Sequence, residues 1–115
     1  MRTTRPIDDE SIINAIESGP LGANGVSGGT RTVTTAGTAV QLSVASVPCK
    51  RVFIQALSAN TGVIAVGGSG VLAASMNGQY FYATQGDWFE VSNLNLIYID
   101  ASVNGEGVGY YYETI

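Results

Sequence analysis

The titratable side chains of this 115-residue chain limit the chemistry that it could perform. The chain contains no histidine and a single cysteine, Cys49. Nucleophilic catalysis that needs histidine and His-ligated zinc are therefore excluded, and one thiol cannot form a thiolate metal site or an intramolecular disulfide. The remaining possibility is a carboxylate pair of the kind that hydrolyses glycosides. The candidate acids after residue 30 are Asp87, Glu90, Asp100, Glu106 and Glu113.

These acids occupy positions that are typical of solvated carboxylates. Asp87 follows a glycine in a predicted turn, and Glu106 follows an Asn-Gly pair. Asp100 alternates with apolar residues, so we expect it on the solvent face of a strand. The sequence also lacks the Asp-x-Asp-x-Asp run of a calcium loop. We expect no catalytic residue, no metal and no cofactor, and we expect Cys49 to be a small buried or semi-buried packing residue.

Composition narrows the classes of partner. Lys and Arg number 5 against 9 Asp and Glu, and the net charge of −4 argues against a nucleic-acid surface. No apolar run approaches the roughly eighteen residues of a membrane span. Acidic residues at positions 8–10 occupy the place where a signal peptide would be apolar, so we expect the whole chain to be the mature protein, made in the cytoplasm. The length predicts one main domain.

Residues 1–28 are predicted to form an N-terminal arm that differs from the rest of the chain. Pro6 and the acidic residues 8–10 favour a helix start, and Gly19-Pro20 favours its end. Residues 19–29 have the glycine-rich composition of a linker. A helix of about three turns is marginal in water, so its isoleucine face must dock on the β body or on a neighbouring subunit. The arm residues expected to bind a partner are Arg2, Arg5, Ile12, Ile13 and Ile16.

Residues 29–115 are predicted to form an antiparallel β-sandwich of about eight strands, jelly-roll or immunoglobulin-like, because short β-prone runs alternate with Gly, Asn and Pro. Two hairpins are expected. One joins 51–57 to 63–66, and the other joins 96–103 to 106–113 through Asn104-Gly105, a strong turn signal. Residues 71–76 fit a short edge strand or a loop. The expected strands cover 31–35, 40–45, 51–57, 63–66, 79–82, 88–91, 96–103 and 106–113.

Aromatic residues are concentrated in the second half of the chain. A strand places consecutive side chains on opposite faces, so the run 110–112 cannot put all three tyrosines on one face. Two interpretations stay open: the rings fill the core and its rims, or some of them form a patch for a protein partner or a sugar ring. Tyr111 and Trp88 are the candidates for sugar contact. The predicted partner-binding patch consists of Tyr98, Tyr110, Tyr111 and Tyr112.

Four segments resemble small virion proteins of tailed bacteriophages. They are 33–43 (VTTAGTAVQLS), 47–52 with 54–56 (VPCKRV and IQA), 60–68 (NTGVIAVGG) and 97–108 (IYIDASVNGEGV). The resemblance covers roughly residues 32–112 and is one of overall pattern, without a catalytic motif. Residues 71–85 depart from it, because this loop is longer and more aromatic than the family pattern.

The resemblance implies a non-enzymatic structural role. Such proteins include capsid decoration (cement) proteins, which bind and stabilise the assembled head, and related modules occur in tails or fibres. We therefore expect a homotrimer that binds the major capsid protein and is located on the virion capsid, assembled in the host cytoplasm. The alternative is a tail or head-fibre module that binds host surface glycan or another virion protein.

Overall fold

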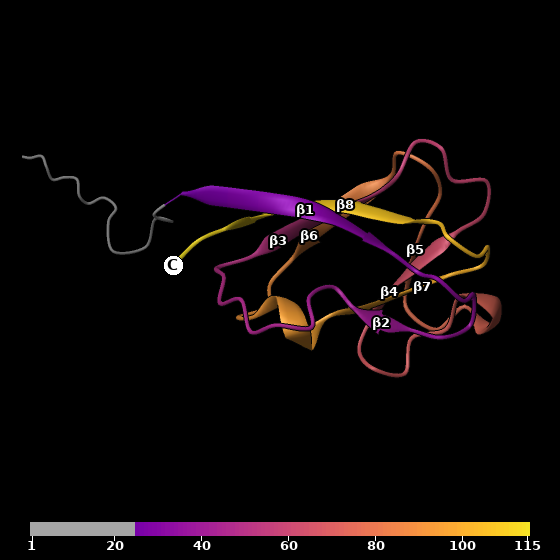
Figure 1. Cartoon of the computed structure of the whole chain (residues 1–115), viewed down its shortest axis with the longest axis horizontal. Coiled ribbons are helices and arrows are strands. Elements are labelled where there is room, and N and C mark those ends of the chain that lie inside the picture. Colours follow the sequence, from indigo (N-terminus) through magenta and orange to yellow (C-terminus); the bar gives the residue numbers. More distant parts are fainter. Residues whose placement is uncertain (1–24) are drawn as a thin grey trace, which may run out of the picture.

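A computed structural model describes residues 25–115, which form eight β-strands and two short 3₁₀ turns (Figure 1). The strands are β1 (Val26–Thr32), β2 (Val40–Gln41), β3 (Val52–Ala56), β4 (Ile64–Gly67), β5 (Gln79–Phe81), β6 (Gly86–Phe89), β7 (Tyr98–Ala101) and β8 (Gly107–Glu113). The 3₁₀ turns are η2 (Ala73–Ser75), within the segment of ambiguous prediction, and η3 (Leu94–Leu96). The predicted all-β character and the predicted strand number are confirmed.

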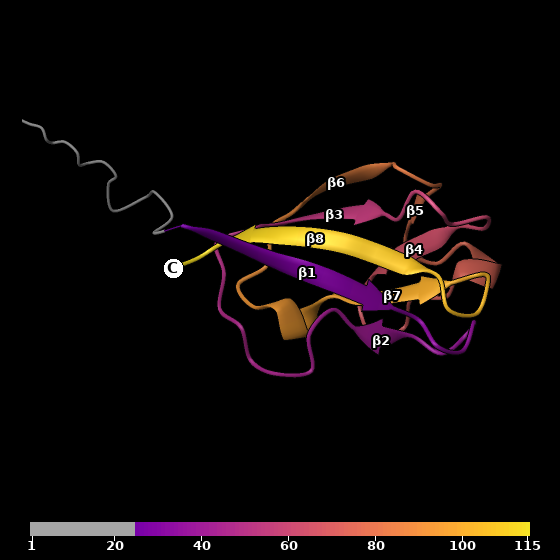
Figure 2. The same cartoon turned by 45° about the horizontal axis from the view of Figure 1, so that its top comes forward.

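The strands pair in a nested order. β1 pairs with β8, β2 with β7, β3 with β6 and β4 with β5, so the first strand of the described chain meets the last. Two further pairings, β3 with β8 and β4 with β7, join these pairs into sheets. The result is two antiparallel four-stranded sheets: the first sheet, β1-β8-β3-β6, and the second sheet, β2-β7-β4-β5. Figure 2 shows the four strands of the first sheet side by side.

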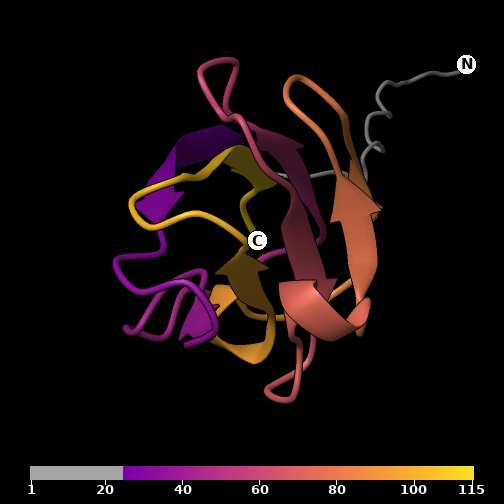
Figure 3. The ribbon, with the colours of Figure 1, turned by 90° about the vertical axis from the view of Figure 1, so that its right-hand side faces the viewer.

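Both sheets contribute to one hydrophobic core. β3 alternates, with Val52, Ile54 and Ala56 buried and Phe53 and Gln55 on the opposite face. The second sheet adds Ile64 and Ile99, among others, to the same cluster. Full burial of one such aliphatic side chain stabilises the fold by roughly 1.5–3 kcal/mol. Figure 3 shows, from the right-hand side of Figure 1, the strands of the two sheets around a common interior.

The two predicted hairpins are wrong. β7 lies in the second sheet and β8 in the first, so the chain passes between sheets at Asn104-Gly105 instead of pairing across this turn. β3 and β4 are separated in the same way. The turn chemistry itself is correct, since Gly105 has a φ of +82°. The partners of β7 and β8 are instead strands that are distant in sequence. β8 pairs with β1 over seven residue pairs, which gives it more pairing than a local hairpin with β7 would.

β1 begins five residues before the predicted first strand. Gly28 and Gly29, which the sequence assigned to the linker, are paired with Tyr111 and Tyr110 of β8. At Gly28 a Cβ atom would clash with the Tyr110 carbonyl oxygen, so this close strand approach requires glycine. The predicted helix and linker over residues 1–24, with Arg2, Arg5, Ile12, Ile13 and Ile16, lie outside the described residues.

Candidate functional site

Asp100 is a buried structural carboxylate, and its predicted position on a solvent face is wrong. It lies on the outer face of the second sheet with no exposed surface, because neighbouring loops cover that face. Its Oδ1 accepts a hydrogen bond from Gly37 N at 2.9 Å, and its Oδ2 accepts one from Ala73 N at 2.8 Å. One carboxylate therefore holds two loops against the sheet.

Glu106 is also occupied by hydrogen bonds, which it forms between the β7–β8 and β3–β4 connections. Its carboxylate accepts hydrogen bonds from Thr61 N at 2.6 Å, from Thr61 Oγ1 at 2.8 Å and from Gly62 N at 2.9 Å. The bond from Thr61 N, followed by that from Gly62 N, lowers the pKa of Glu106 below its usual value. This group joins residues 61–62 to the 103–107 connection.

Three other predicted titratable candidates also have ordinary surroundings. Glu113 Oε2 accepts a hydrogen bond from Arg51 at 3.0 Å, while Asp87 and Glu90 are exposed. Cys49 is buried, as predicted, and its Sγ lies 3.1 Å from the Val91 carbonyl oxygen. Burial raises the pKa of the Cys49 thiol. Within residues 25–115 no cluster of acids and cysteines could hold a metal ion.

The four tyrosines of the predicted patch do not form one surface. Tyr98 lies on the outer face of the second sheet among the residues packed around Ala65. Tyr110 and Tyr112 stack on each other with ring centroids 6.3 Å apart, and both pack against the main core. Tyr111 alone points to the outer face of the first sheet, where its side chain is 45% exposed. The expectation that the run 110–112 divides between two faces is confirmed, and Tyr98 and Tyr111 lie on different sheets.

Tyr111 belongs to a row of three aromatic residues, here called the aromatic row: Trp88, Phe53 and Tyr111. Register pairs Phe53 with Trp88 of β6 on one side and with Tyr111 of β8 on the other. Ring centroids lie 5.4 Å apart for Phe53–Trp88 and 5.5 Å apart for Phe53–Tyr111. Arg51 places its guanidinium 3.9 Å from the centroid of the Trp88 ring. Trp, Tyr and Arg are the residue types that dominate binding surfaces.

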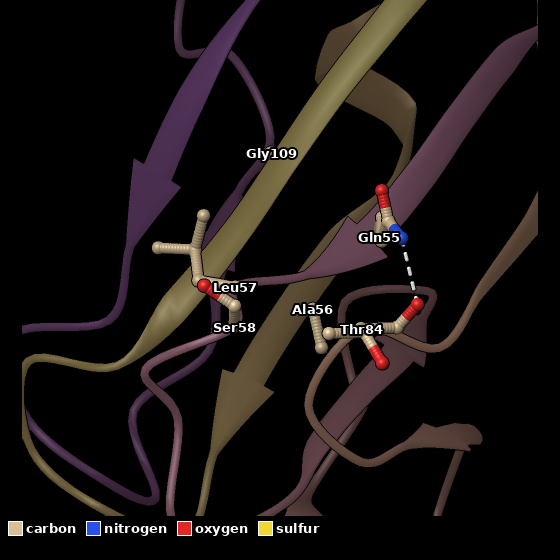
Figure 4. A pocket seen from close by; sticks show the side chains of 6 residues that line it. All are labelled: Gln55, Ala56, Leu57, Ser58, Thr84 and Gly109. Atoms are coloured by element: carbon tan, nitrogen blue, oxygen red, sulfur yellow. Dashed lines mark hydrogen bonds between the residues drawn. The ribbon is translucent and has the colours of Figure 1, made fainter.

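A pocket adjoins the aromatic row along the first sheet. Gln55 is two residues after Phe53 on the same face of β3, and it pairs with Gly109 of β8 and Gly86 of β6. The cavity measures about 210 Å³. This volume is below the roughly 300 Å³ lower limit of drug-sized sites, so the cavity suits one small ring or side chain. We call this cavity the sheet pocket. It is lined by Gln55, Ala56, Leu57, Ser58, Thr84 and Gly109 (Figure 4).

Thr84 has an unusual backbone conformation in this pocket. Its φ is +69°, a region that β-branched residues rarely adopt and that costs of order 1–3 kcal/mol. Its backbone is held on both sides: Thr84 N donates to Ala56 O at 3.0 Å, and Thr84 O accepts from Gln55 Nε2 at 2.7 Å, the bond drawn in Figure 4. Strained residues of this kind concentrate at functional sites.

The sequence pattern identified Tyr111 and Trp88 as candidates for contact but did not single out Phe53, Arg51 or Gln55. The alternation of residues 51–57 already places these three side chains on one face. What the sequence lacks is the register that brings Trp88 and Tyr111 to either side of Phe53. Aromatic residues at the middle of several predicted strands are the available signal, and it does not say which strands are neighbours.

Comparison of the chain with protein-family models, with curated proteins and with solved structures yields no match. Over residues 25–115, no helix is long and apolar enough to cross a membrane. The assignment of a function therefore depends on the geometry described above.

Proposed function

We propose that this chain is a non-enzymatic structural protein of a tailed bacteriophage, a decoration protein that binds and stabilises the assembled head. The proposed fold is a β-sandwich of the jelly-roll type. Nested pairing of eight strands in two four-stranded sheets is the arrangement of a double-sheet jelly roll, which occurs in viral capsid and lectin domains. An immunoglobulin-like order, with seven strands divided four and three in its simplest form, fits less well.

The observation that carries the proposal is how the N-terminal segment joins the body. β1 is an edge strand of the first sheet, and Gly25 O accepts a hydrogen bond from Thr114 N at 2.8 Å. The described chain therefore begins, at Gly25, beside its C-terminus, which Figure 1 marks next to the start of β1. Among the described residues, the buried members of the main core lie between Val33 and Val108. We propose that the arm binds outside its own body.

The proposed mechanism is an addition of buried area across joints in the shell. The arm residues Ile12, Ile13 and Ile16 dock on the major capsid protein or on a neighbouring copy of a trimer. A ligand that binds only the assembled state stabilises that state by mass action. No catalytic step, cofactor, nucleic acid or membrane enters this role.

The arm is tested in the full chain by replacing Ile12, Ile13 and Ile16 together with serine. We expect occupancy on purified heads, measured by density in image reconstructions and by sedimentation, to fall by about tenfold or more, because three apolar anchors are lost. The matched control is Val44→Ser, which removes an apolar side chain 72% exposed on the body. Full occupancy by the triple variant would contradict the proposed arm, and absence of the wild-type chain from heads would contradict the capsid role.

A second candidate function is a tail or head-fibre module that binds host surface glycan. The aromatic row favours it, since an exposed tyrosine beside two further aromatic residues suits stacking against a sugar ring.

A further inference from the structure

We propose that the sheet pocket and Tyr111 together form a binding site for a neutral glycan, with one pyranose ring in the pocket and the next against Tyr111. This inference goes beyond the capsid role and gives the second candidate function a defined site. It requires only that the outer face of the first sheet is accessible in the virion.

The pocket chemistry selects a neutral, hydroxylated ligand. No charged residue lines the cavity. Among the hydrogen bonds formed within residues 25–115, none uses the hydroxyls of Ser58 and Thr84 or the Oε1 atom of Gln55. These groups leave two hydroxyls and one amide oxygen available to a ligand, while Leu57 supplies an apolar wall. Alternating hydroxyl and C–H surfaces are characteristic of a pyranose ring.

The geometry of β8 connects the pocket to the aromatic row. Gly109 and Tyr111 are two residues apart on one face of the strand, a distance of about 7 Å. The absence of a side chain at Gly109 leaves the pocket open toward that ring. A glycan chain leaving the pocket along β8 therefore meets Tyr111, whose ring also contacts Trp88 with centroids 5.3 Å apart.

Thr84 gives an independent indication that the pocket is used. It retains a β-branched side chain at a φ of +69°, where glycine or asparagine would fit without strain. Its hydroxyl group is the feature that those residues lack. A binding site that needs this hydroxyl explains why position 84 is threonine. A turn that served only to connect β5 and β6 would not explain it.

Gly109 offers a substitution that fills the site without disturbing the fold. A Cβ atom there would meet only Leu57 Cδ2, at 3.8 Å, which is ordinary van der Waals contact. Valine is favoured in strands, so Gly109→Val is expected to fold normally while its side chain occupies the cavity. Gly68→Val is the matched control, because the added Cβ atom at Gly68 meets nothing within 4 Å and lies in a loop of the second sheet.

The test uses the full-length chain and a panel of neutral oligosaccharides, of two to six units, built from glucose, galactose, mannose or N-acetylglucosamine. Binding is measured on an array and then by titration calorimetry. We expect at least one series to bind the wild type, Gly109→Val to lose about tenfold or more in affinity and Tyr111→Ala to lose several-fold, roughly three- to tenfold. The controls Gly68→Val and Leu96→Ala, the latter removing another exposed apolar side chain, should bind as the wild type does.

Circular dichroism and thermal unfolding establish that each variant is folded before its affinity is interpreted. Failure of every oligosaccharide to bind at millimolar concentration would overturn the proposal, as would equal binding by Gly109→Val and the wild type. Occupancy on heads separates this site from the capsid role. If Gly109→Val or Tyr111→Ala loses head occupancy, the face is a contact to the capsid and the glycan site is overturned, while the capsid proposal stands.

Discussion

The outer faces of the two sheets differ in what lies over them. On the second sheet, η2 and residues near Ala39 cover Ala65, and Asp100 is completely buried beneath them. On the outer face of the first sheet, β8 carries Tyr111, which is 45% exposed and lies beside Phe53 and Trp88. Within residues 25–115, the chain thus supplies a cover for one face from its own loops and leaves aromatic surface on the other.

The largest expected effect comes from breaking the covered face. Asp100→Ala removes the acceptor of two backbone N–H groups that are buried or partly buried, Gly37 N and Ala73 N. Hydrogen bonds to a charged acceptor contribute roughly 1.5–3 kcal/mol each, so we expect a loss of about 3 kcal/mol in the free energy of unfolding. Urea denaturation measures this loss.

The control for Asp100→Ala is Glu90→Ala, which removes an exposed acid and should change stability by about 0.5 kcal/mol or less. Asp100→Asn retains one acceptor and should lie between the two. Equal stability of Asp100→Ala and the wild type would mean that the loops cover the second sheet without the carboxylate.

A smaller effect, of opposite sign, is expected on the open face. Thr84→Asn replaces a β-branched residue at a φ of +69° with one that tolerates this region, and the side chain of Thr84 is exposed. We expect the free energy of unfolding to rise by about 1 kcal/mol. The measurement is thermal unfolding, with Thr34→Asn, at another exposed loop threonine, for comparison.

A gain in stability that accompanies weaker glycan binding would show that Thr84 is kept for the pocket at the expense of the fold. A loss of stability in Thr84→Asn would instead assign the residue a purely structural role. The difference between the two outer faces would then depend on Tyr111 and its neighbours alone.

The smallest expected effect lies at the end of the molecule that belongs to neither face. Hydrogen bonds from Thr61 and Gly62 lower the pKa of Glu106 in the folded chain. A lowered folded pKa contributes stability that is present above the unfolded value of about 4.3 and is lost as the pH falls through the folded pKa. Stability should therefore decline on acidification below about pH 5. In Glu106→Gln this part of the decline should be absent, as measured by urea denaturation at pH 7 and at pH 3.5.

The positions of most strands along the chain, and the face on which their apolar side chains lie, could be predicted from local pattern. The alternation in 51–57 and in 97–101 places Ile54 and Ile99 each on an apolar face of a strand, and both are fully buried. The Asn-Gly pair at 104–105 marks a real turn with positive φ. These features depend on neighbouring residues, so the sequence contains the necessary information.

Pairing partners could not be predicted in the same way. Asn104-Gly105 reverses the chain equally well in a hairpin and in a connection between sheets, and only the competing register of β1 with β8 decides between them. The buried state of Asp100 has the same origin, because Gly37 and Ala73 lie 63 and 27 residues away in sequence. Alternation assigns Asp100 to the outer face but does not say that loops cover it.

The sequence by itself determined an all-β body over residues 29–115, a chain without histidine, alternating strands and at least one tyrosine of the run 110–112 turned away from the others. Those outcomes follow from side-chain chemistry and from the two-residue period of a strand. The tertiary structure alone decided which strands are neighbours, and with it the aromatic row, the sheet pocket and the covered position of Asp100. The physical reason is that pairing between distant strands is selected by the burial of the whole core. Residues from many parts of the chain contribute to that burial, so no short segment determines it.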